Sequence, residues 1–346
     1  MNMPLMQFIM NLKEMMNNMK KINLAIVGAT GVVGQKFLEV IDERKIPFDN
    51  LYLFASKKSA GKEIIFQGKT YTVIELNEAN IKAHDIDFAL FSAGGSTALT
   101  YAPIFAKQKT IVIDNSSAFR MYQDVPLVVP EVNADQAFKH NYIIANPNCS
   151  TIQAALVLKP LHDHYGLKRV VMSTYQAVSG AGIEGIHDLE NELETGHTKK
   201  FPYQIHHNVI PQIDVFLEDG NTKEEEKMMN EMKKILNLPH LKITATAVRV
   251  PVVHGHSESI NIEFNKAFEL SSIYNILEDA PGVIVYDNPS ELKYPMPILA
   301  EGKDEVFVGR IRTDKSVDYG INCFVVADNI RKGAATNAVQ ILELFL

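Results

Sequence analysis

Cys149 is one of two cysteines in the 346-residue chain, and it stands where a cysteine can react. It follows an apolar run at residues 142–145 and a turn at residues 146–148, and it precedes a helical pattern. The backbone N–H groups in the first turn of a helix carry partial positive charge, which stabilises a thiolate and lowers the pKa of a thiol. The position predicts a nucleophile, whereas most unpaired cysteines are small core residues.

A second reactive pattern lies at residues 248–258, where an arginine inside an apolar strand precedes a glycine turn with two histidines. An arginine buried in such a strand, Arg249, requires an anionic partner. A histidine titrates near neutral pH and can carry a proton during a reaction. His254, His256 and Glu258 also resemble metal ligands, but no further ligands stand near them. The pattern favours an acid/base histidine and no metal site.

Glycines at positions 28, 31 and 34 separate a strand-like run at residues 21–27 from a helical pattern that continues to about residue 44. Such a turn lets a pyrophosphate approach bare backbone at a helix N-terminus, although a plain tight turn has the same composition. For NAD, an acidic residue is expected after the second strand. The chain has Lys57 and Lys58 between two serines there, which favours the 2′-phosphate of NADP over a simple solvated turn.

Two further segments carry polar groups of less specific meaning. Residues 114–120 end in Arg120, whose forked donors suit a phosphate or carboxylate, although most arginines lie on the surface. Thr222 and Glu225 fit a helix capping box, which is a sufficient structural explanation for both. Glu225 and Lys227 are two residues apart and point to different sides of a helix, so their spacing does not predict a shared site.

The elements that must position these residues fall into two groups. Up to Cys149, apolar runs alternate with helical stretches such as residues 96–108, which predicts a doubly wound, Rossmann-like domain with a parallel sheet over residues 21–149. Its strands are expected at residues 21–27, 50–55, 86–93, 110–113 and 142–145.

After the helix expected at residues 151–165, β-branched runs predict an α+β domain over residues 150–327 with a mixed or mostly antiparallel sheet. Helical patterns at residues 182–195 and 222–236 are expected to cover one face of that sheet, and a helix within residues 328–346 to return to the first domain. The strands are expected at residues 169–176, 242–250, 259–264, 306–312 and 318–326.

Composition narrows the class of protein. A net charge of -7 without a sustained basic run argues against a nucleic acid or an anionic membrane as partner. Two cysteines give no disulfide framework and suit a reducing compartment, so we expect the cytoplasm. Residues 1–20 hold seven of the thirteen methionines and are expected to be a disordered or misannotated extension.

Taken together, these segments resemble the aspartate-β-semialdehyde dehydrogenases over residues 22–346. The resemblance implies reversible, phosphate-dependent oxidation of L-aspartate 4-semialdehyde to L-4-aspartyl phosphate with NADP, a step towards lysine, diaminopimelate, threonine and methionine. It also implies a homodimer, or a tetramer formed from two dimers. The motifs that carry it are residues 28–34, 114–120, 147–151, 174–180, 249–251 with 254–257, and 327–335.

Carried over to this sequence, the resemblance implies a role for each matching residue. Cys149 would form an acyl-enzyme, His256 would be its acid/base, and Gln176 would orient the substrate or the thioester oxygen. Arg249 would bind the substrate α-carboxylate and Glu225 its amino group, while phosphate would contact Arg120, Asn115 and Lys227. The expected cofactor contacts are Thr30, Gly31, Val32, Val33, Gly34, Lys58, Ser59, Ser179, Gly180 and Asn329.

One match is imperfect, because Lys58 stands where the family usually has arginine, and lysine offers a point charge without a fork. The alternative reaction is that of N-acetyl-γ-glutamyl-phosphate reductase, whose longer substrate has a blocked amine. An alternative of another class is a cofactor-binding regulator that has lost catalysis. The partners expected are a small substrate and inorganic phosphate.

Overall fold

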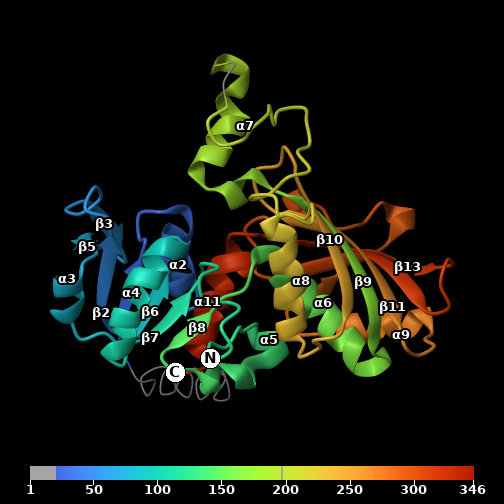
Figure 1. Ribbon diagram of the computed structural model, residues 1–346, viewed down its shortest axis with the longest axis horizontal. Coiled ribbons are helices and arrows are strands. Elements are labelled where there is room, and N and C mark those ends of the chain that lie inside the picture. The colour runs from blue at the N-terminus through green and yellow to red at the C-terminus, as the bar shows by residue number, and fades with distance from the viewer. Residues whose placement is uncertain (1–20, 196–197) are drawn as a thin grey trace, which may run out of the picture.

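A computed structural model describes residues 21–195 and 198–346, so the extension expected at residues 1–20 lies outside the described part. Two six-stranded sheets lie side by side, the first at the left of Figure 1 and the second at the right. Every strand pair in the first sheet is parallel, as predicted. Its order is β5 (Ile74–Glu75), β2 (Phe48–Ala55), β1 (Ile22–Val27), β6 (Phe88–Phe91), β7 (Ile111–Asp114), β8 (Ile143–Ala145).

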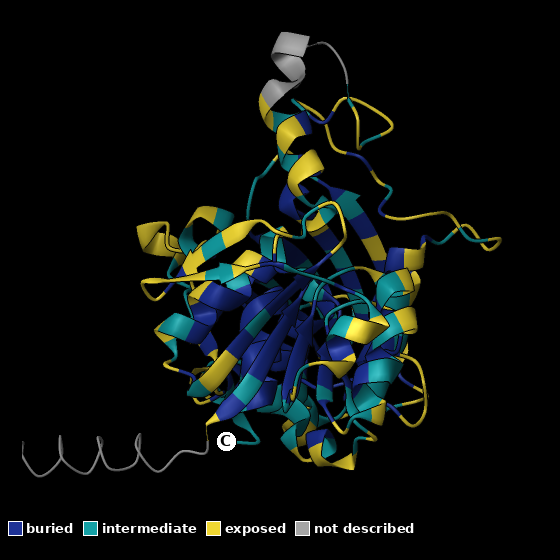
Figure 2. Ribbon diagram, turned by 90° about the vertical axis from the view of Figure 1, so that its left-hand side faces the viewer, coloured by how far each residue is buried: buried dark blue, intermediate teal, exposed yellow. Residues whose placement is uncertain are grey.

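Helices cover both faces of the first sheet because its central strands are apolar on both sides. Leu24 and Ile26 of β1 pack with α2 (Val32–Glu43), and Ala25 and Val27 pack in the cluster that includes α4 (Gly95–Lys107). Figure 2 shows these strands as a buried layer. A short hairpin of β3 (Glu63–Phe66) and β4 (Lys69–Thr72), with α3 (Glu78–Lys82), lies at one side.

The second sheet is mixed, as predicted: its two outer pairs are parallel and the three inner pairs antiparallel. One face packs on α6 (Cys149–Tyr165), α8 (Lys223–Ile235) and α9 (Leu270–Glu278). The order is β10 (Lys242–Arg249), β9 (Leu167–Gln176), β11 (His256–Phe264), β14 (Gly320–Ala327), β13 (Val306–Asp314), β12 (Val283–Val285).

The helix α7 (Ile183–Thr195) corrects one prediction, because it projects from the body and does not cover the sheet with α8 (Figure 1). Its apolar residues Ile186 and Leu189 pack on a small separate cluster formed by Val178, Ile205 and Ile210. Helical periodicity identifies the apolar face of a helix but not the surface that receives it.

The chain returns to the first sheet at its C-terminal end. A π-helical turn at Arg331–Ala335 leads into α11 (Thr336–Glu343), whose Val339 and Leu342 join the core around β1. The fully buried Lys332 forms an ion pair of 2.7 Å with Glu131 in α5 (Pro130–Asn133). Within the described residues, no helix has both the length and the apolarity needed to cross a membrane.

Candidate active site

A cavity of about 490 Å³ lies where the carboxyl ends of the parallel strands face the second sheet. Ligands of doubly wound sheets bind at such an edge. Segments that follow β1, β6, β7 and β8 line one side, and the ends of β9 and β10 with the start of α8 line the other. Twelve of the predicted site residues line it: Gly31, Val32, Val33, Asn115, Arg120, Cys149, Gln176, Ser179, Gly180, Lys227, Arg249 and Asn329.

Cys149 begins α6, and the side chain of Asn148 caps that helix by accepting the N–H groups of Ser150 and Thr151. The C-terminal segment passes close to Cys149 at Gly333. A side chain at that position would not fit, because its Cβ would lie 2.9 Å from the Cys149 Cβ. Burial, and then the Glu224 carboxylate, raise the pKa of the Cys149 thiol to about 12, although Arg120, Arg249 and the Ser150 N–H oppose them. Desolvation thus opposes the lowering of the thiol pKa expected from the helix N-terminus, although by surface area the Cys149 side chain is only partly buried.

Arg249 ends β10 as a buried guanidinium without a carboxylate partner among the described ion pairs. Its Nη1 donates to the carbonyl of Ala177 at 2.6 Å, and its buried Nε has no hydrogen-bond partner in the described protein. Burial lowers the pKa of Arg249, while Glu224 and Cys149 oppose that shift. A desolvated cation with unused donors facing a cavity is suited to an anionic group.

His256 begins β11 just behind the cavity lining and is fully buried. Its Nδ1 accepts the backbone N–H of Ala177 at 3.0 Å, which assigns the proton of the neutral ring to Nε2. Burial and the Arg249 cation hold the pKa of His256 well below its usual value. Nε2 faces Gly180, and a Cβ at that position would lie 3.3 Å from it. Because glycine has no Cβ, the Nε2–H of His256 can point towards the cavity.

The two neighbouring glutamates at the start of α8 have different surroundings. Glu225 is wholly engaged in local structure: its carboxylate accepts the N–H of Thr222 at 2.6 Å and that of Ala247 at 2.9 Å. It does not line the cavity, and both of its carboxylate oxygens accept backbone N–H groups, so the expected contact with a substrate amine stays a prediction that this geometry does not favour. Glu224 lines the cavity instead and accepts hydrogen bonds from Asn148 at 2.7 Å and Gln176 at 3.3 Å.

Lys227 lies one helical turn after Glu224, with its Nζ 3.4 Å from that carboxylate and 2.7 Å from Asp214. Burial alone would lower the pKa of Lys227, but Glu224 and Asp214 together raise it, so the side chain stays charged. The spacing in the sequence already indicates which glutamate lies beside Lys227. Residues three apart share a helix face, and Glu224, not Glu225, is three residues before Lys227.

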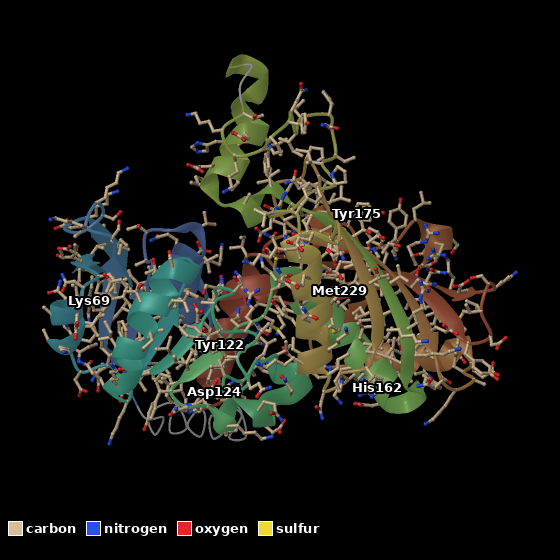
Figure 3. The ribbon with its side chains drawn as sticks, in the orientation of Figure 1. Lys69, Tyr122, Asp124, His162, Tyr175 and Met229 are labelled. Atoms are coloured by element: carbon tan, nitrogen blue, oxygen red, sulfur yellow. The ribbon has the colours of Figure 1, made fainter. Side chains whose placement is uncertain are left out.

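Arg120 is held from three directions. Its Nε donates to the carbonyl of Asn146, Nη2 to that of Asn115, and Nη1 to Glu231 at 3.0 Å. One N–H on each Nη remains for a ligand. Lys234 of α8 donates to the carbonyls of Arg120 and Tyr122, so the loop rests on α8, with Tyr122 between the first sheet and that helix in Figure 3.

The glycine turn fits a pyrophosphate. Gly28 has a φ of 89°, and a Cβ there would lie 2.3 Å from the Ser92 carbonyl oxygen. Gly31 caps α2 without a side-chain hydrogen bond, so the first N–H groups of α2 are open to an anion. Gly34 is buried against Gly28, which lets helix and turn pack closely.

The remaining predicted cofactor residues lie in two places. Thr30, Lys58 and Ser59 do not line the cavity. Lys58 is exposed on the turn after β2. That strand lies beside the glycine turn, because the carbonyl of Phe54 in β2 accepts the N–H of Gly28. Asn329 follows β14 and bonds both the Ser179 hydroxyl, at 3.0 Å, and the N–H of Gly255, at 2.9 Å. Together with Gly180, Ser179 and Asn329 line the same cavity as residues 31–33 of the glycine turn.

Among residues 21–195 and 198–346, no group of three His, Cys, Asp or Glu side chains is arranged to hold a metal ion. Several lining residues were not among the predicted site residues, although some of them lie within the motifs at residues 114–120, 147–151 and 327–335. They are Ser92, Ser117, Pro147, Asn148, Gly182, Ile183, Ile213, Glu224, Ile330, Gly333 and Ala334.

Two domain families and several characterised enzymes are similar to this chain. Residues 23–140 match the semialdehyde dehydrogenase NAD binding domain, and residues 158–332 match the semialdehyde dehydrogenase dimerisation domain. The aspartate-semialdehyde dehydrogenase of Aquifex aeolicus is 57% identical over 93% of this chain and 97% of its own.

Two solved structures share the fold. Aspartate semialdehyde dehydrogenase II from Vibrio cholerae, complexed with ASA, has a TM-score of 0.89 and 46% identity, covering 94% of this chain and 98% of that one. The enzyme from Candida albicans, with NADP, has a TM-score of 0.76 and 25% identity, with coverage of 94% and 98%. The chain belongs to the aspartate-semialdehyde dehydrogenase family.

Proposed function

We propose that the protein reduces L-4-aspartyl phosphate to L-aspartate 4-semialdehyde reversibly, with NADP and release of phosphate, through a thioester on Cys149. The observation that carries the proposal is one cavity in which Cys149 lies with the unpaired cation Arg249 and the carboxylate Glu224. An amino acid carries both charges that such a pair would bind, and the cysteine is then left to react with its side-chain carbonyl.

The substrate is held at each end. Arg249 binds the α-carboxylate through its unused donors, and Glu224 binds the ammonium group in place of Glu225. Gln176, which donates to Glu224, sits next to the bound substrate and orients its reacting carbonyl. At the other end Arg120, Lys227 and Asn115 surround the phosphate; two of these are cations, which suits a dianion.

The Cys149 sulfur attacks the carbonyl of the acyl phosphate, the C–O bond to phosphate breaks, and the thiol proton leaves with the phosphate. The leaving phosphate accepts this proton, because the neutral His256 ring accepts the Ala177 N–H at Nδ1 and therefore carries its own proton at Nε2. When bound, NADPH supplies the hydride that reduces the thioester to a thiohemiacetal, which releases the aldehyde and the cysteine.

His256 contributes as a donor. Its Nε2–H stabilises negative charge on the substrate oxygen during attack and hydride transfer. To act as a base towards the thiol at Nε2, the neutral ring would have to carry its proton at Nδ1, and Nδ1 could then no longer accept the Ala177 N–H. The structure thus favours the acid half of the expected acid/base role.

The glycine turn and the first N–H groups of α2 would hold the pyrophosphate of the cofactor, and Ser179, Gly180 and Asn329 would hold its nicotinamide portion. Lys58 reads the 2′-phosphate of NADP, a proposal supported by its exposed position at the sheet edge and by the NADP of the Candida albicans relative.

The active form is a homodimer joined through the second domain, or a tetramer of two such dimers, in the cytoplasm. The matched dimerisation domain supports the dimer, as do Tyr175 and Phe324, whose tilted rings lie 6.3 Å apart on the sheet face opposite α6 (Figure 3 labels Tyr175). The product serves the synthesis of lysine, threonine and methionine.

The competing reaction, that of N-acetyl-γ-glutamyl-phosphate reductase, is disfavoured by Glu224. Its substrate has an uncharged amide where the aspartyl substrate has an ammonium group, so a carboxylate at that place would be desolvated without a cation. Reduction of NADP is measured with aspartate semialdehyde and with N-acetylglutamate semialdehyde, each with and without phosphate. We expect phosphate-dependent activity with aspartate semialdehyde only. Activity with N-acetylglutamate semialdehyde alone, or activity that does not depend on phosphate, contradicts the proposal.

A further inference from the structure

Glu231, in the middle of α8, is a buried carboxylate for which the reaction above has no use. It is 1% exposed and lies one helical turn further along the face that carries Glu224 and Lys227. Its two oxygens reach different segments of the first domain. Oε1 accepts Arg120 Nη1 at 3.0 Å, and Oε2 accepts the backbone N–H of Asn148 at 2.7 Å.

Both partners are next to reacting groups. Arg120 lines the cavity with two N–H groups left for a ligand, and Asn148 is the residue before Cys149 and the cap of its helix. Asn148 is also fixed by Glu224, to which its side chain donates at 2.7 Å. One carboxylate therefore joins the guanidinium expected at phosphate to the backbone that aims the nucleophile.

A carboxylate at this place is costly for the fold. Burial raises the pKa of Glu231, and only Arg120 and the Asn148 N–H act against that shift. Desolvating an ion pair is seldom repaid in stability, because apolar side chains of similar volume fill such a space as well or better. Met228 and Met232, beside it on α8, show that the helix packs through apolar residues.

We propose that Glu231 is a positioning residue that couples the phosphate contact of Arg120 to the orientation of Cys149. This inference rests on the proposed function. Its carboxylate holds the guanidinium with its free N–H groups towards the cavity, and it fixes the turn before Cys149 in the same geometry. A ligand that pulls on Arg120 thus acts on the segment that carries the sulfur.

The test compares Glu231→Gln with the wild-type enzyme in the oxidative direction, with inorganic phosphate as the varied substrate. Glutamine has the same shape but offers one oxygen acceptor, so either Arg120 or the Asn148 N–H loses its partner. We expect the KM for phosphate to rise about tenfold or more and kcat to fall, with the KM for aspartate semialdehyde changed less than about threefold. Met232→Leu is the matched control and should leave all three constants unchanged.

A double variant separates positioning from general damage. If Glu231 acts through Arg120, Arg120→Lys and Glu231→Gln together should raise the KM for phosphate hardly more than Arg120→Lys alone. Additive effects, or a Glu231→Gln enzyme with normal phosphate kinetics, overturn the inference.

If Glu231→Gln does not fold, Glu231→Asp takes its place, because it keeps the charge and shortens the reach; an unchanged KM for phosphate in that variant equally overturns the inference. A wild-type enzyme without phosphate dependence instead contradicts the proposed function itself, so the two failures are distinct.

Discussion

Where residues 31–33 line the cavity, a ligand meets backbone at a helix N-terminus, whereas the side formed by β10 and α8 presents the buried, charged side chains of Arg249 and Glu224. The first side needs only a helix N-terminus and room to approach it. The second needs each charge to be held by neighbours, because a desolvated ion without partners is destabilising. A site that binds a ligand through its backbone can therefore be recognised from one short segment of sequence. A site that binds through buried charged side chains depends on segments far apart in the sequence.

Cys149 follows β8 and lines the same cavity as these charges, and removal of its sulfur should have the largest effect. Cys149→Ser should lower kcat by roughly a thousandfold or more, because an alkoxide forms far less readily than a thiolate and its ester accepts hydride poorly. Steady-state kinetics measure the loss, with NADP binding and the circular dichroism spectrum as controls. Turnover near that of the wild type would show that no covalent sulfur intermediate is needed.

The neighbouring glutamates give a matched pair of variants. Glu224→Ala should lower kcat/KM for aspartate semialdehyde by about 30-fold or more, since the ammonium group loses its counter-charge. Glu225→Ala should keep the kinetics and lose about 1–3 kcal/mol of stability, because two backbone N–H groups lose their acceptor. Kinetics and thermal unfolding are measured on both. The reverse pattern would return the amine contact to Glu225.

The capping-box residue shows how far sequence reasoning reached. Parallel and mixed sheets, the helix that starts at Cys149 and the glycine turn follow from periodicity and local steric rules, and the structure has all of them. The family resemblance implies that Glu225 binds the substrate amino group, whereas the sequence around it already indicates a helix capping box. Glu231 has no local signal at all, because its partners Arg120 and Asn148 are 111 and 83 residues away.

The same limit explains other differences. The length and pattern of α7 predict a helix, but its receiving surface at Ile205 and Ile210 lies in a later loop. The pKa of Cys149 depends on how deeply the assembled cavity buries the thiol, which a helix N-terminus alone does not determine. The short strand β12 has only three residues and no clear period.

On the backbone side, one side chain is expected to matter for cofactor choice. Lys58→Glu should raise the Kd for NADP about tenfold or more while the Kd for NAD changes little, because a carboxylate repels a 2′-phosphate and accepts a 2′-hydroxyl. Fluorescence titration with both reduced cofactors measures this, with Lys57→Glu as control. Equal weakening of both cofactors would remove Lys58 from the 2′-phosphate site.

The smallest effect is expected in stability. Glu258 lies fully buried opposite Ser150 and Gln153 under the first turn of α6, and burial raises its pKa well above the usual value. Its unfolded form ionises near pH 4.5 while the folded form keeps its proton, so this group destabilises the fold increasingly as pH rises above 4.5 towards the folded pKa.

Glu258→Gln removes that titration. The variant should therefore gain thermal stability relative to the wild type as pH rises from about 4.5 to 8, which calorimetry across that range measures. A difference in Tm that is constant with pH would mean that Glu258 is charged in the folded protein.

The covalent step can be observed directly by mass spectrometry of the intact protein. The enzyme is mixed with aspartate semialdehyde and NADP without phosphate, quenched in acid and weighed; Cys149→Ala is treated in the same way. We expect a mass increase of one aspartyl group on the intact protein, found on the peptide that contains Cys149 after digestion, and its disappearance when phosphate is added before the quench. Reduced cofactor formed without any acyl group on Cys149, or the same adduct on the Cys149→Ala protein, would contradict the thioester mechanism.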